Sequence, residues 1–323
     1  MTVKRFPAGA AAFLARRLTR LLVAVVVVVT ISFAMIHLTP GDPIRTALGP
    51  TAPEELVAAR RAALGLDQPL LTQYVTYVRG LLTGDLGHSF VNGQSVTEVV
   101  ATRLPGTVQL AALSLGLVLL LAVPTGLLVA VLTRDGRRRG LELGYTAVTS
   151  VFHAVPEYLL AVGLVFLFAV TWPVFPVAGI VGPSSYVLPV LSLAIVPLAV
   201  LTRIARAESL RALGADYVRT ARGKRLSPRL VYFRHVLPNT LTAVLTLGGT
   251  MVTGLIVSSV LVEKVFNWPG LGSMIVQSIE LQDYGLVQGI TLVYAVVVLV
   301  ANLIVDIVLG LLDRRTTLRE ETA

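Results

Sequence analysis

Six long apolar runs constrain this chain more than any other feature of its sequence. A helix of about 20 mostly apolar residues can cross the roughly 30 Å of hydrocarbon in a bilayer. The composition agrees, since 55% of the 323 residues are apolar, only 14% are charged and the mean hydropathy is +0.80. The sequence therefore predicts an all-α, polytopic membrane bundle of six transmembrane helices. The expected spans lie at residues 18–38, 107–132, 145–171, 187–207, 240–262 and 286–312.

The first apolar run resembles a secretory signal peptide, because Lys4, Arg5, Arg16 and Arg17 precede it. The run is too long for that purpose, however, and the sequence TPGDP follows it where a small-residue cleavage site would stand. We expect a retained anchor helix, preceded by a cytoplasmic tail over residues 1–17.

The distribution of Lys and Arg predicts how the helices are oriented. Six spans place both termini on one side, and 21 of the 27 basic residues fall in the tails and in the loops that share that side. Cytoplasmic loops carry such an excess. We therefore expect both termini on the cytoplasmic side of the membrane. The net charge of +9 then reflects topology, and no nucleic-acid partner is expected.

Two connections are too long to be simple turns. The extracytoplasmic segment, residues 39–103, is expected to contain two helices. Thr51 and Glu54 have the spacing of a capping box before a first helix that ends at Gly65. Asp67 and Pro69 precede a second helix. The other long connection, residues 208–239, lies on the cytoplasmic side.

The chain lacks the residues of an enzyme site. It contains no cysteine, no G-x-x-x-x-G-K-[ST] phosphate loop, no H-E-x-x-H and no G-x-S-x-G, and its four histidines are scattered. We expect no catalytic residue, no metal and no cofactor of its own. Pumps and proton-coupled carriers place several ionisable groups at membrane depth, whereas here Glu157 is the clearest candidate. An energy-coupled transporter of this kind would draw its energy from another subunit.

The cytoplasmic loop is predicted to fold into two short helices. The first covers DYVRTARGK, and the second begins with Ser227 as N-cap and Pro228 at the first helical position. An apolar stripe with a basic opposite face indicates a docking surface for a protein partner. A helix on the lipid surface and a solvated loop that only sets orientation remain as alternatives. The stripe consists of Leu226, Leu230, Phe233 and Leu237.

This loop resembles the EAA loop of binding-protein-dependent ABC importer permeases. That pattern is E-A-A, three residues, Gly, nine residues and I-x-L-P. Arg219-Thr220-Ala221 takes the place of E-A-A, and His235-Val236-Leu237-Pro238 takes the place of I-x-L-P. The run DYVRTAR followed by K-x-L-S-P-R is typical of the peptide/nickel branch. Further similar stretches are ARRL…LTPGDP (15–43), GLDQPLLTQYVTYVRGLLTGDLGHS (65–89), RLPGTVQLA (103–111), LVEKVFNWPGLG (261–272), DYGLVQG (283–289) and NLIVDIVLGLLD (302–313).

One position departs from the family pattern. The Gly expected within the loop is Arg225 here, and a Gly stands two positions earlier, at Gly223. If the turn needs a positive φ at Arg225, the side chain costs about 1 kcal/mol or more. Otherwise the turn has moved to Gly223.

The resemblance implies a type I ABC importer permease in the inner or plasma membrane of a prokaryotic cell, with a core over residues 107–312 and a cytoplasmic tail over residues 313–323. Its partners would be a second, related permease with which it would form a heterodimer, two cytoplasmic ATPase subunits that bind ATP-Mg, an extracytoplasmic solute-binding protein and membrane lipid. The expected cargo is di- or oligopeptides. The residues expected to couple to the ATPases are Asp216, Arg219, Thr220, Ala221, Gly223, Arg225 and Leu226.

Two other features carry expectations. Glu157 follows Pro156 within the third run, where a carboxylate costs roughly 2.5–3.5 kcal/mol on insertion scales. It is a candidate for the translocation pathway, with a paired or protonated interface carboxyl as the alternative. Small residues four positions apart predict close helix packing, within the chain or with the partner permease. These are Gly126/Ala130, Gly254/Ser258 and Gly285/Gly289.

Three other functions compete with a peptide importer. A stand-alone secondary transporter would need more ionisable residues in its spans. An intramembrane enzyme would need a nucleophile with its base, or a metal cluster. The third is the same type of importer with nickel, an opine or glutathione as cargo, and the residues do not distinguish among these cargoes. The extracytoplasmic segment would dock the solute-binding protein or close an outer gate, unless it only shields the spans.

Overall fold

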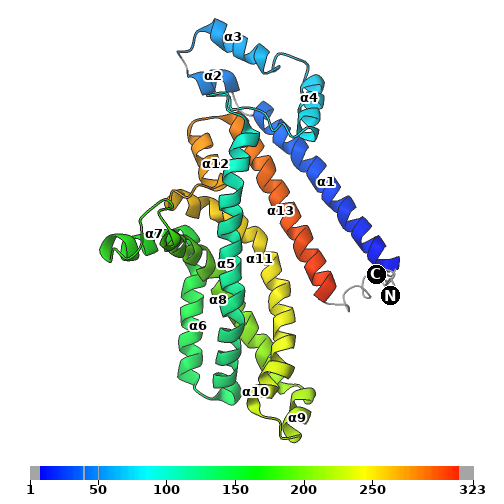
Figure 1. The fold of residues 1–323 in the computed structure, drawn as a ribbon, viewed down its shortest axis with the longest axis vertical. Coiled ribbons are helices and arrows are strands. Elements are labelled where there is room, and N and C mark those ends of the chain that lie inside the picture. The colour runs from blue at the N-terminus through cyan, green and yellow to red at the C-terminus, as the bar shows by residue number, and fades with distance from the viewer. Residues whose placement is uncertain (1–7, 39–40, 50, 313–323) are drawn as a thin grey trace. The chain divides into compact units, whose positions relative to one another are not determined.

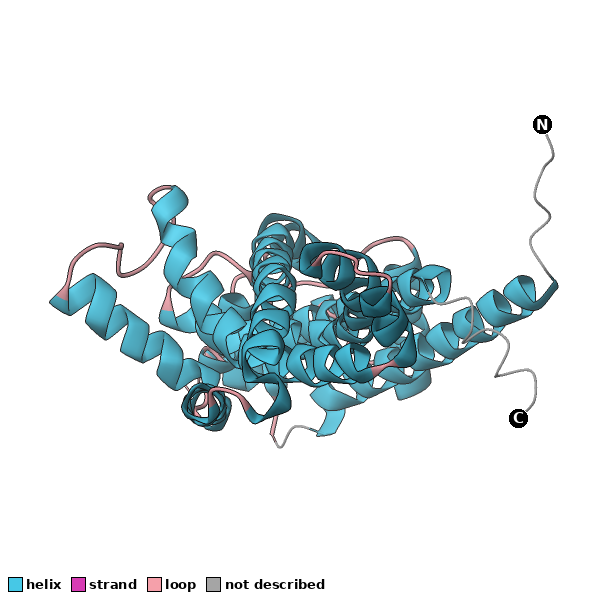
Figure 2. Ribbon diagram, turned by 90° about the horizontal axis from the view of Figure 1, so that it is seen from below, coloured by secondary structure: helices cyan, strands magenta, loops and turns pink. Residues whose placement is uncertain are grey.

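The computed structural model describes the backbone of residues 8–38, 41–49 and 51–312, and these residues form helices and loops (Figure 2). Within that part of the chain, the nearest approach to a strand is an isolated bridge between His88 and Ser95. The chain divides into two compact units. Unit 1 comprises Met1–Thr107 and Pro269–Leu303, and unit 2 comprises Val108–Trp268 and Ile304–Ala323.

Unit 1 contains the first apolar helix, the short helices of the extracytoplasmic segment and most of the last helix (Figure 1). Two apolar clusters hold it together. One joins Val96 and Val99 to Leu286 and Ile290, and the other lies around Ile44, Val57 and Phe90. Its elements are α1 (Ala8–Leu38), α2 (Pro43–Leu48), α3 (Glu54–Ala63), α4 (Leu70–Leu82), the first part of α5 (Val96–Thr133), α12 (Leu271–Glu280) and α13 (Tyr284–Leu312).

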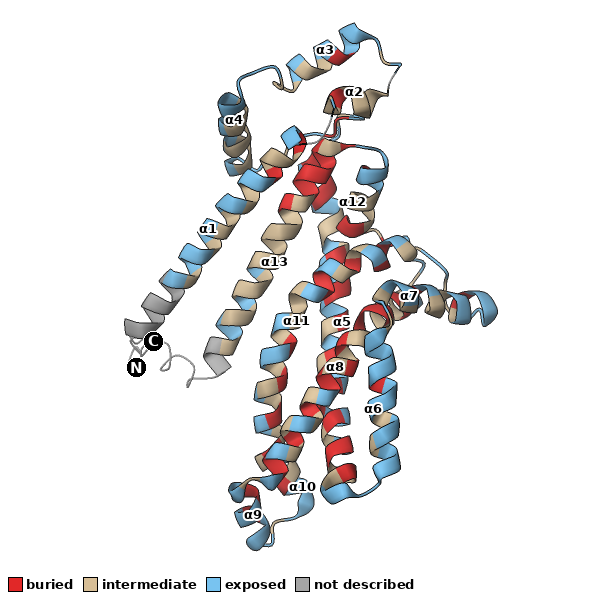
Figure 3. Ribbon diagram, turned by 180° about the vertical axis from the view of Figure 1, so that it is seen from behind, coloured by how far each residue is buried: buried red, intermediate tan, exposed pale blue. Residues whose placement is uncertain are grey.

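Unit 2 is built around α8, which packs along α11 and also contacts α6 and α7. Its buried residues concentrate on α8, whereas α6 is exposed along most of its length (Figure 3). The segments η2 and η4 are π-helical turns. The elements are the rest of α5, η1 (Arg134–Gly136), α6 (Arg139–Ala154), α7 (Glu157–Val165), η2 (Phe166–Thr171), η3 (Pro183–Tyr186), α8 (Val187–Gly214), α9 (Asp216–Gly223), α10 (Pro228–Val231), η4 (Tyr232–Val236) and α11 (Leu237–Val265).

Five of the six predicted spans are single helices long and apolar enough to cross a membrane. The third, expected over residues 145–171, is instead two helices, α6 and α7, bent by 99° at their junction. Pro156 explains the break, because it cannot donate a backbone hydrogen bond and forces the residue before it out of helical geometry. Val155 is accordingly extended, with φ −84° and ψ 126°.

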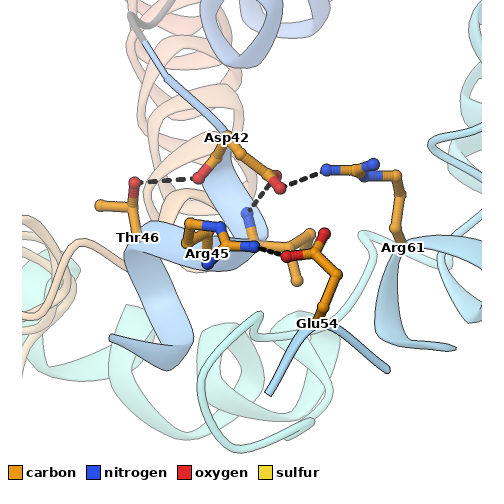
Figure 4. A network of polar contacts seen from close by, with 6 residues as sticks. Asp42, Arg45, Thr46, Glu54 and Arg61 are labelled. Atoms are coloured by element: carbon orange, nitrogen blue, oxygen red, sulfur yellow. Dashed lines mark hydrogen bonds and ion pairs between the residues drawn. The ribbon is translucent and has the colours of Figure 1, made fainter. Parts of the chain in front are cut away.

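The segment predicted to be extracytoplasmic forms its two expected helices, α3 and α4, and a further short helix, α2, before them, but one predicted cap was wrong. Pro53 occupies the N-cap of α3 without a side-chain cap, so Thr51 and Glu54 form no capping box. Glu54 instead pairs with Arg45 (Figure 4). The predicted end at Gly65 is confirmed by its φ of +67°, and α4 follows Pro69 directly.

Asp42 organises the start of this segment. Its carboxylate accepts a hydrogen bond from the Ile44 N–H at 3.0 Å and so caps α2, while it also pairs with Arg61 of α3 (Figure 4). Gly41 has φ +93°, a conformation that glycine adopts without strain, and it lets the chain bend after α1. Pro40, which precedes it, lies outside the described residues, as do the tail residues 1–7 and 313–323.

The predicted small-residue contacts divide into two groups. A Cβ on Gly126 would lie 2.4 Å from that of Ala205, so α5 and α8 touch there. Gly285 and Gly289 pack as closely against the loop before α5. Gly254, in contrast, is exposed with open space beside it. The first two contacts are therefore internal to the chain.

The stretch LVEKVFNWPGLG forms the turn at the end of α11. Trp268 is buried, donates its backbone N–H to the Glu263 carbonyl at 2.8 Å and meets the Tyr186 ring edge-on at 4.7 Å. Glu263 is itself fully buried and accepts a hydrogen bond from the Ser259 hydroxyl at 3.2 Å. These contacts give the stretch a structural role in unit 2.

Candidate functional site

The predicted cytoplasmic loop is a compact projection between α8 and α11, which we call the knob, residues 215–236. Figure 1 shows α9 and α10 together at one end of those two long helices. Helix α8 extends to Gly214, so residues 208–214 are helical and not part of the loop. Ala215 breaks the helix with an extended backbone, ψ 151°. The chain then reverses through two short helices before it enters α11.

The local sequence accounts for each turn of the knob. Asp216 begins α9, and the Thr220 hydroxyl donates back to its carbonyl at 3.0 Å. Ser227 caps α10 as predicted, accepting the Leu230 N–H at 3.4 Å, and Pro228 occupies the first helical position. The π-helical turn η4 then connects α10 to α11 without a break in the helix.

The inner face of the knob is packed against unit 2. Val218, Ala221, Val231 and Val236 are buried in one cluster with Ala130 at the end of α5 and with Ala212 and Leu213 of α8. Leu226 and Tyr232 pack against the same cluster. Because interiors are close-packed, a displacement of the knob would be transmitted to α5 and α8.

The outer face of the knob combines apolar and cationic side chains. Phe233 is 67% exposed, Tyr217 44% and Leu230 39%. An apolar patch rimmed by arginine is typical of a protein-binding surface. The surrounding cations, all exposed, are Arg219, Arg222, Lys224, Arg225, Arg229 and Arg234.

The structure separates the predicted coupling residues into two groups. Asp216, Arg219, Thr220, Gly223 and Arg225 are exposed. Arg219 lies 3.4 Å from the Asp216 carboxylate, in an ion pair too exposed to add much stability. These residues are available to a partner.

Ala221 and Leu226 lie on the opposite side of the knob. Ala221 is 4% exposed and Leu226 is partly buried, and both contact the chain's own core. Their apolar surface is therefore already covered within the chain. They hold the knob in place. The predicted stripe likewise divides, because Leu230 and Phe233 are exposed while Leu226 and Leu237 face inward.

The backbone decides between the two positions considered for the positive-φ turn. Arg225 has φ +57°, whereas Gly223 is the last residue of α9 and has no positive φ. The turn therefore stays where the family pattern places its glycine, and an arginine occupies a left-handed conformation. Such a residue costs roughly 1–2 kcal/mol.

A cavity of about 420 Å³ beside the knob adds residues that the sequence pattern did not single out. Arg222 and Leu226 line it from the knob, and Arg134 and Arg137 line it from the connection after α5. The sequence had marked these two arginines only as topological charges. Tyr217 was also missed, although it is an exposed aromatic within the resembling stretch.

Glu157 does not lie within a continuous span. It is the first residue of α7, directly after the break at Pro156, and is half-buried. A carboxylate there is favoured by the unpaired N–H groups and dipole of the helix N-terminus.

Comparison with known proteins agrees with this architecture. Residues 122–318 match the family described as "Binding-protein-dependent transport system inner membrane component", and residues 10–111 match the N-terminal domain described for the same systems. The two matches together span nearly the whole chain. This chain belongs to that family. The resemblance inferred from the loop is thereby confirmed.

Relatives align over most of this permease. The glutathione transport system permease protein GsiC of Salmonella typhimurium is 34% identical over 296 residues, which cover 91% of this chain and 95% of GsiC. The dipeptide transport system permease protein DppB of Lactococcus lactis is 35% identical over 310 residues, 95% of this chain and 99% of DppB. DppB of Bacillus subtilis is 31% identical over 312 residues.

A solved structure shows the same fold. A chain of the MetNI methionine ABC transporter, in an inward-facing conformation, superposes with a TM-score of 0.53 at 14% identity, covering 67% of this permease and 96% of that chain. The predicted all-α permease architecture is confirmed. The permease is a multi-pass membrane protein and a transport subunit, not an enzyme. Membership of the family implies partnership with an ATPase and a solute-binding protein.

Proposed function

We propose that this permease forms the translocation pathway of an importer for di- or oligopeptides, and that ATP-Mg hydrolysis in two separate ATPase subunits drives it through the knob. A second, related permease completes the pathway, and an extracytoplasmic solute-binding protein delivers the cargo. The two-faced construction of the knob carries the proposal, because one short element joins an exposed binding surface to the buried core of unit 2.

The chemistry of the outer face suits an acidic partner groove with an apolar floor. Phe233 and Tyr217 are large aromatic side chains, the type that contributes most to binding at interfaces. The arginines around them would pair with carboxylates and would steer association. Arg134 and Arg137 extend this cationic surface beyond the knob. The exposed group predicted from the sequence, Asp216, Arg219, Thr220, Gly223 and Arg225, belongs to it.

The peptide cargo rests on the relatives. Two of them, from Lactococcus lactis and Bacillus subtilis, are named for dipeptides, and the Salmonella relative is named for glutathione. Glutathione, a tripeptide, is therefore the second candidate. A thermal-shift screen of the cognate solute-binding protein against dipeptides, oligopeptides and glutathione would decide between them, since each stabilises only a protein that binds it.

The topology follows from the basic residues. Both termini and the knob are cytoplasmic, and the extracytoplasmic segment is positioned to dock the solute-binding protein or to close an outer gate. Glu157 belongs to the pathway in this scheme, at the break between α6 and α7, where a carboxylate would meet a cationic group of the cargo. Replacing Glu157 with Gln should then lower uptake of lysine-containing dipeptides more than uptake of dialanine.

The coupling role is tested in the complete complex reconstituted in proteoliposomes. Phe233→Asp should reduce ATP-driven uptake of a labelled dipeptide about tenfold or more, because it would place a charge where the aromatic side chain is buried against the ATPase in the proposed complex. Leu82→Asp is the matched control, since Leu82 is also strongly exposed but lies in unit 1. Unimpaired uptake in Phe233→Asp, with the ATPase still bound, would refute the proposed coupling surface.

A further inference from the structure

A groove between α6 and α8 has the chemistry of a second binding site. It encloses about 530 Å³ and lies apart from the knob, within unit 2. The polar lining consists of Tyr145, Thr146 and His153 of α6 and of Arg203 and Arg206 of α8, and Val200 and Ile204 contribute apolar surface. The site joins positive charge to a hydrocarbon wall.

The two arginines of the groove differ in their partners. The Arg206 guanidinium donates to the Glu142 carboxylate at 2.5 Å and to the Thr133 hydroxyl at 3.1 Å, so its position is held by the protein. Arg203 is exposed and forms no ion pair with any residue in the described part of the chain. The groove therefore has one cation without a compensating anion.

The hydroxyl of Tyr145 is the second unsatisfied group. It is buried beside Thr202, whose hydroxyl is close enough to influence it, but no partner among the described residues meets both the distance and the angle of a hydrogen bond. Buried polar groups in native proteins are almost always paired, so such a hydroxyl needs a partner from outside. A donor and an uncompensated cation facing one groove predict an anionic oxygen between them.

The surroundings indicate where that oxygen comes from. Helix α6, which forms one wall of the groove, also carries exposed apolar side chains outside the groove lining, and Figure 3 shows the helix exposed along most of its length. These side chains match hydrocarbon rather than water. They include Leu143, Val148 and Val151, which are 62%, 54% and 60% exposed.

We propose that this groove binds the phosphate headgroup of an anionic phospholipid. Arg203 and the Tyr145 hydroxyl contact the phosphate oxygens, Arg206 adds positive charge, and Val200 and Ile204 contact the upper part of an acyl chain. Basic pockets between membrane helices on the cytoplasmic side bind such headgroups. The assignment rests on the proposed topology, which places this end of α8 at the cytoplasmic leaflet. A bound lipid would fill the space between α6 and α8 and join them.

The test uses the complete importer in nanodiscs that contain phosphatidylglycerol and phosphatidylcholine, followed by native mass spectrometry of the lipid that stays bound. Arg203→Gln should lower retention of phosphatidylglycerol about fivefold, the effect of one basic residue near an anionic headgroup. Tyr145→Phe should lower it as well. Arg211→Gln is the matched control, because Arg211 lies on the same helix but pairs with Glu208 at 2.7 Å.

Two outcomes would overturn the lipid site. One is equal retention of phosphatidylglycerol by the parent and by Arg203→Gln. The other is that added dipeptide, and not the lipid, loses affinity in Arg203→Gln, which would make the groove a site for the cargo carboxylate. Neither measurement depends on ATP-driven uptake. A lost lipid site with normal uptake would therefore leave the proposed function intact.

Discussion

Ser89 donates a hydrogen bond to the carboxylate of Asp283, 194 positions later in the chain. Both residues are buried, and the same carboxylate accepts the backbone N–H of Phe90 at 2.9 Å and of Leu286 at 3.3 Å. Asp283 therefore caps the N-terminus of α13, and its hydrogen bonds hold the loop before α5 against that helix. Two of the stretches that resemble the family, those ending at Ser89 and beginning at Asp283, meet at this point in unit 1.

Removing this carboxylate should destabilise unit 1. Asp283→Ala leaves the Ser89 hydroxyl and the Phe90 N–H buried without their acceptor, and each hydrogen bond to a charged group contributes about 1.5–3 kcal/mol. We expect a loss of about 3 kcal/mol, seen as a lower melting temperature in detergent and as faster hydrogen exchange over residues 86–95. Asp67→Ala, at an exposed carboxylate of the same segment, should change neither. Unchanged exchange in Asp283→Ala would contradict the fastening role.

Two glycines test the close packing of the helices. A Cβ on Gly285 would lie 2.2 Å from the His88 carbonyl oxygen, so Gly285→Ala should push the loop away and cost about 3 kcal/mol. Gly254→Ala, also within a long helix but beside open space, should be neutral or stabilise by up to about 1 kcal/mol through helix propensity. Melting temperatures of the two purified variants give the comparison. Equal changes in melting temperature would show that the loop containing His88 moves to accept the added methyl group, and would contradict the close packing.

The left-handed turn of the knob predicts opposite effects for two neighbouring arginines. Arg225→Gly relieves a residue with φ +57° and should stabilise by about 1 kcal/mol. Arg222→Gly places a glycine inside α9 and should destabilise by a similar amount. Both substitutions remove one positive charge from the same surface. A difference between their melting temperatures therefore reports the backbone conformation and not the charge. A lower melting temperature for Arg225→Gly would refute the strained turn.

Acid should weaken the contacts that Asp42 makes at the start of α2. Burial raises the pKa of Asp42, but the hydrogen bonds from Ile44 and Arg61 and the charge of Arg61 outweigh it, so the pKa lies below its usual value of 3.8. A carboxyl with a lowered pKa stabilises the fold fully above the usual value, and this contribution is lost as the pH falls through the folded pKa. Proteolysis between residues 41 and 64 should therefore accelerate below about pH 4. Asp42→Asn should be cleaved faster at neutral pH and show a flatter acid dependence, and a parallel response in both proteins would exclude Asp42 as the cause.

The absence of cysteine makes the orientation directly measurable, because an introduced thiol is the only one in the chain. Glu55→Cys, on exposed α3, should react with a membrane-impermeant maleimide in intact cells. Arg222→Cys, on the knob, should react only after the membrane is permeabilised. The reverse pattern would invert the proposed topology, and with it the coupling surface.

Much of the fold is readable from the sequence because its causes are local. Apolar runs long enough to cross a bilayer predicted six spans, of which five are single helices, and Ser227 with Pro228 marked the start of α10. Arg225 also kept the turn that the family pattern assigns to a glycine. Pro156 also marks the break in the third span, because its effect on the backbone is local. The apolar composition of that run, taken alone, predicted one continuous helix.

Only the tertiary structure decided which face of each element is covered. Ala221 and Leu226 turned inward and Phe233 outward because the ends of α5 and α8, more than 80 positions apart, supply the apolar surface against which the knob packs. The contact between Ser89 and Asp283, the cation cavity beside the knob and the groove between α6 and α8 likewise join distant segments. A residue's sequence neighbours set its backbone conformation, whereas its burial and charge environment depend on segments that only folding brings to it.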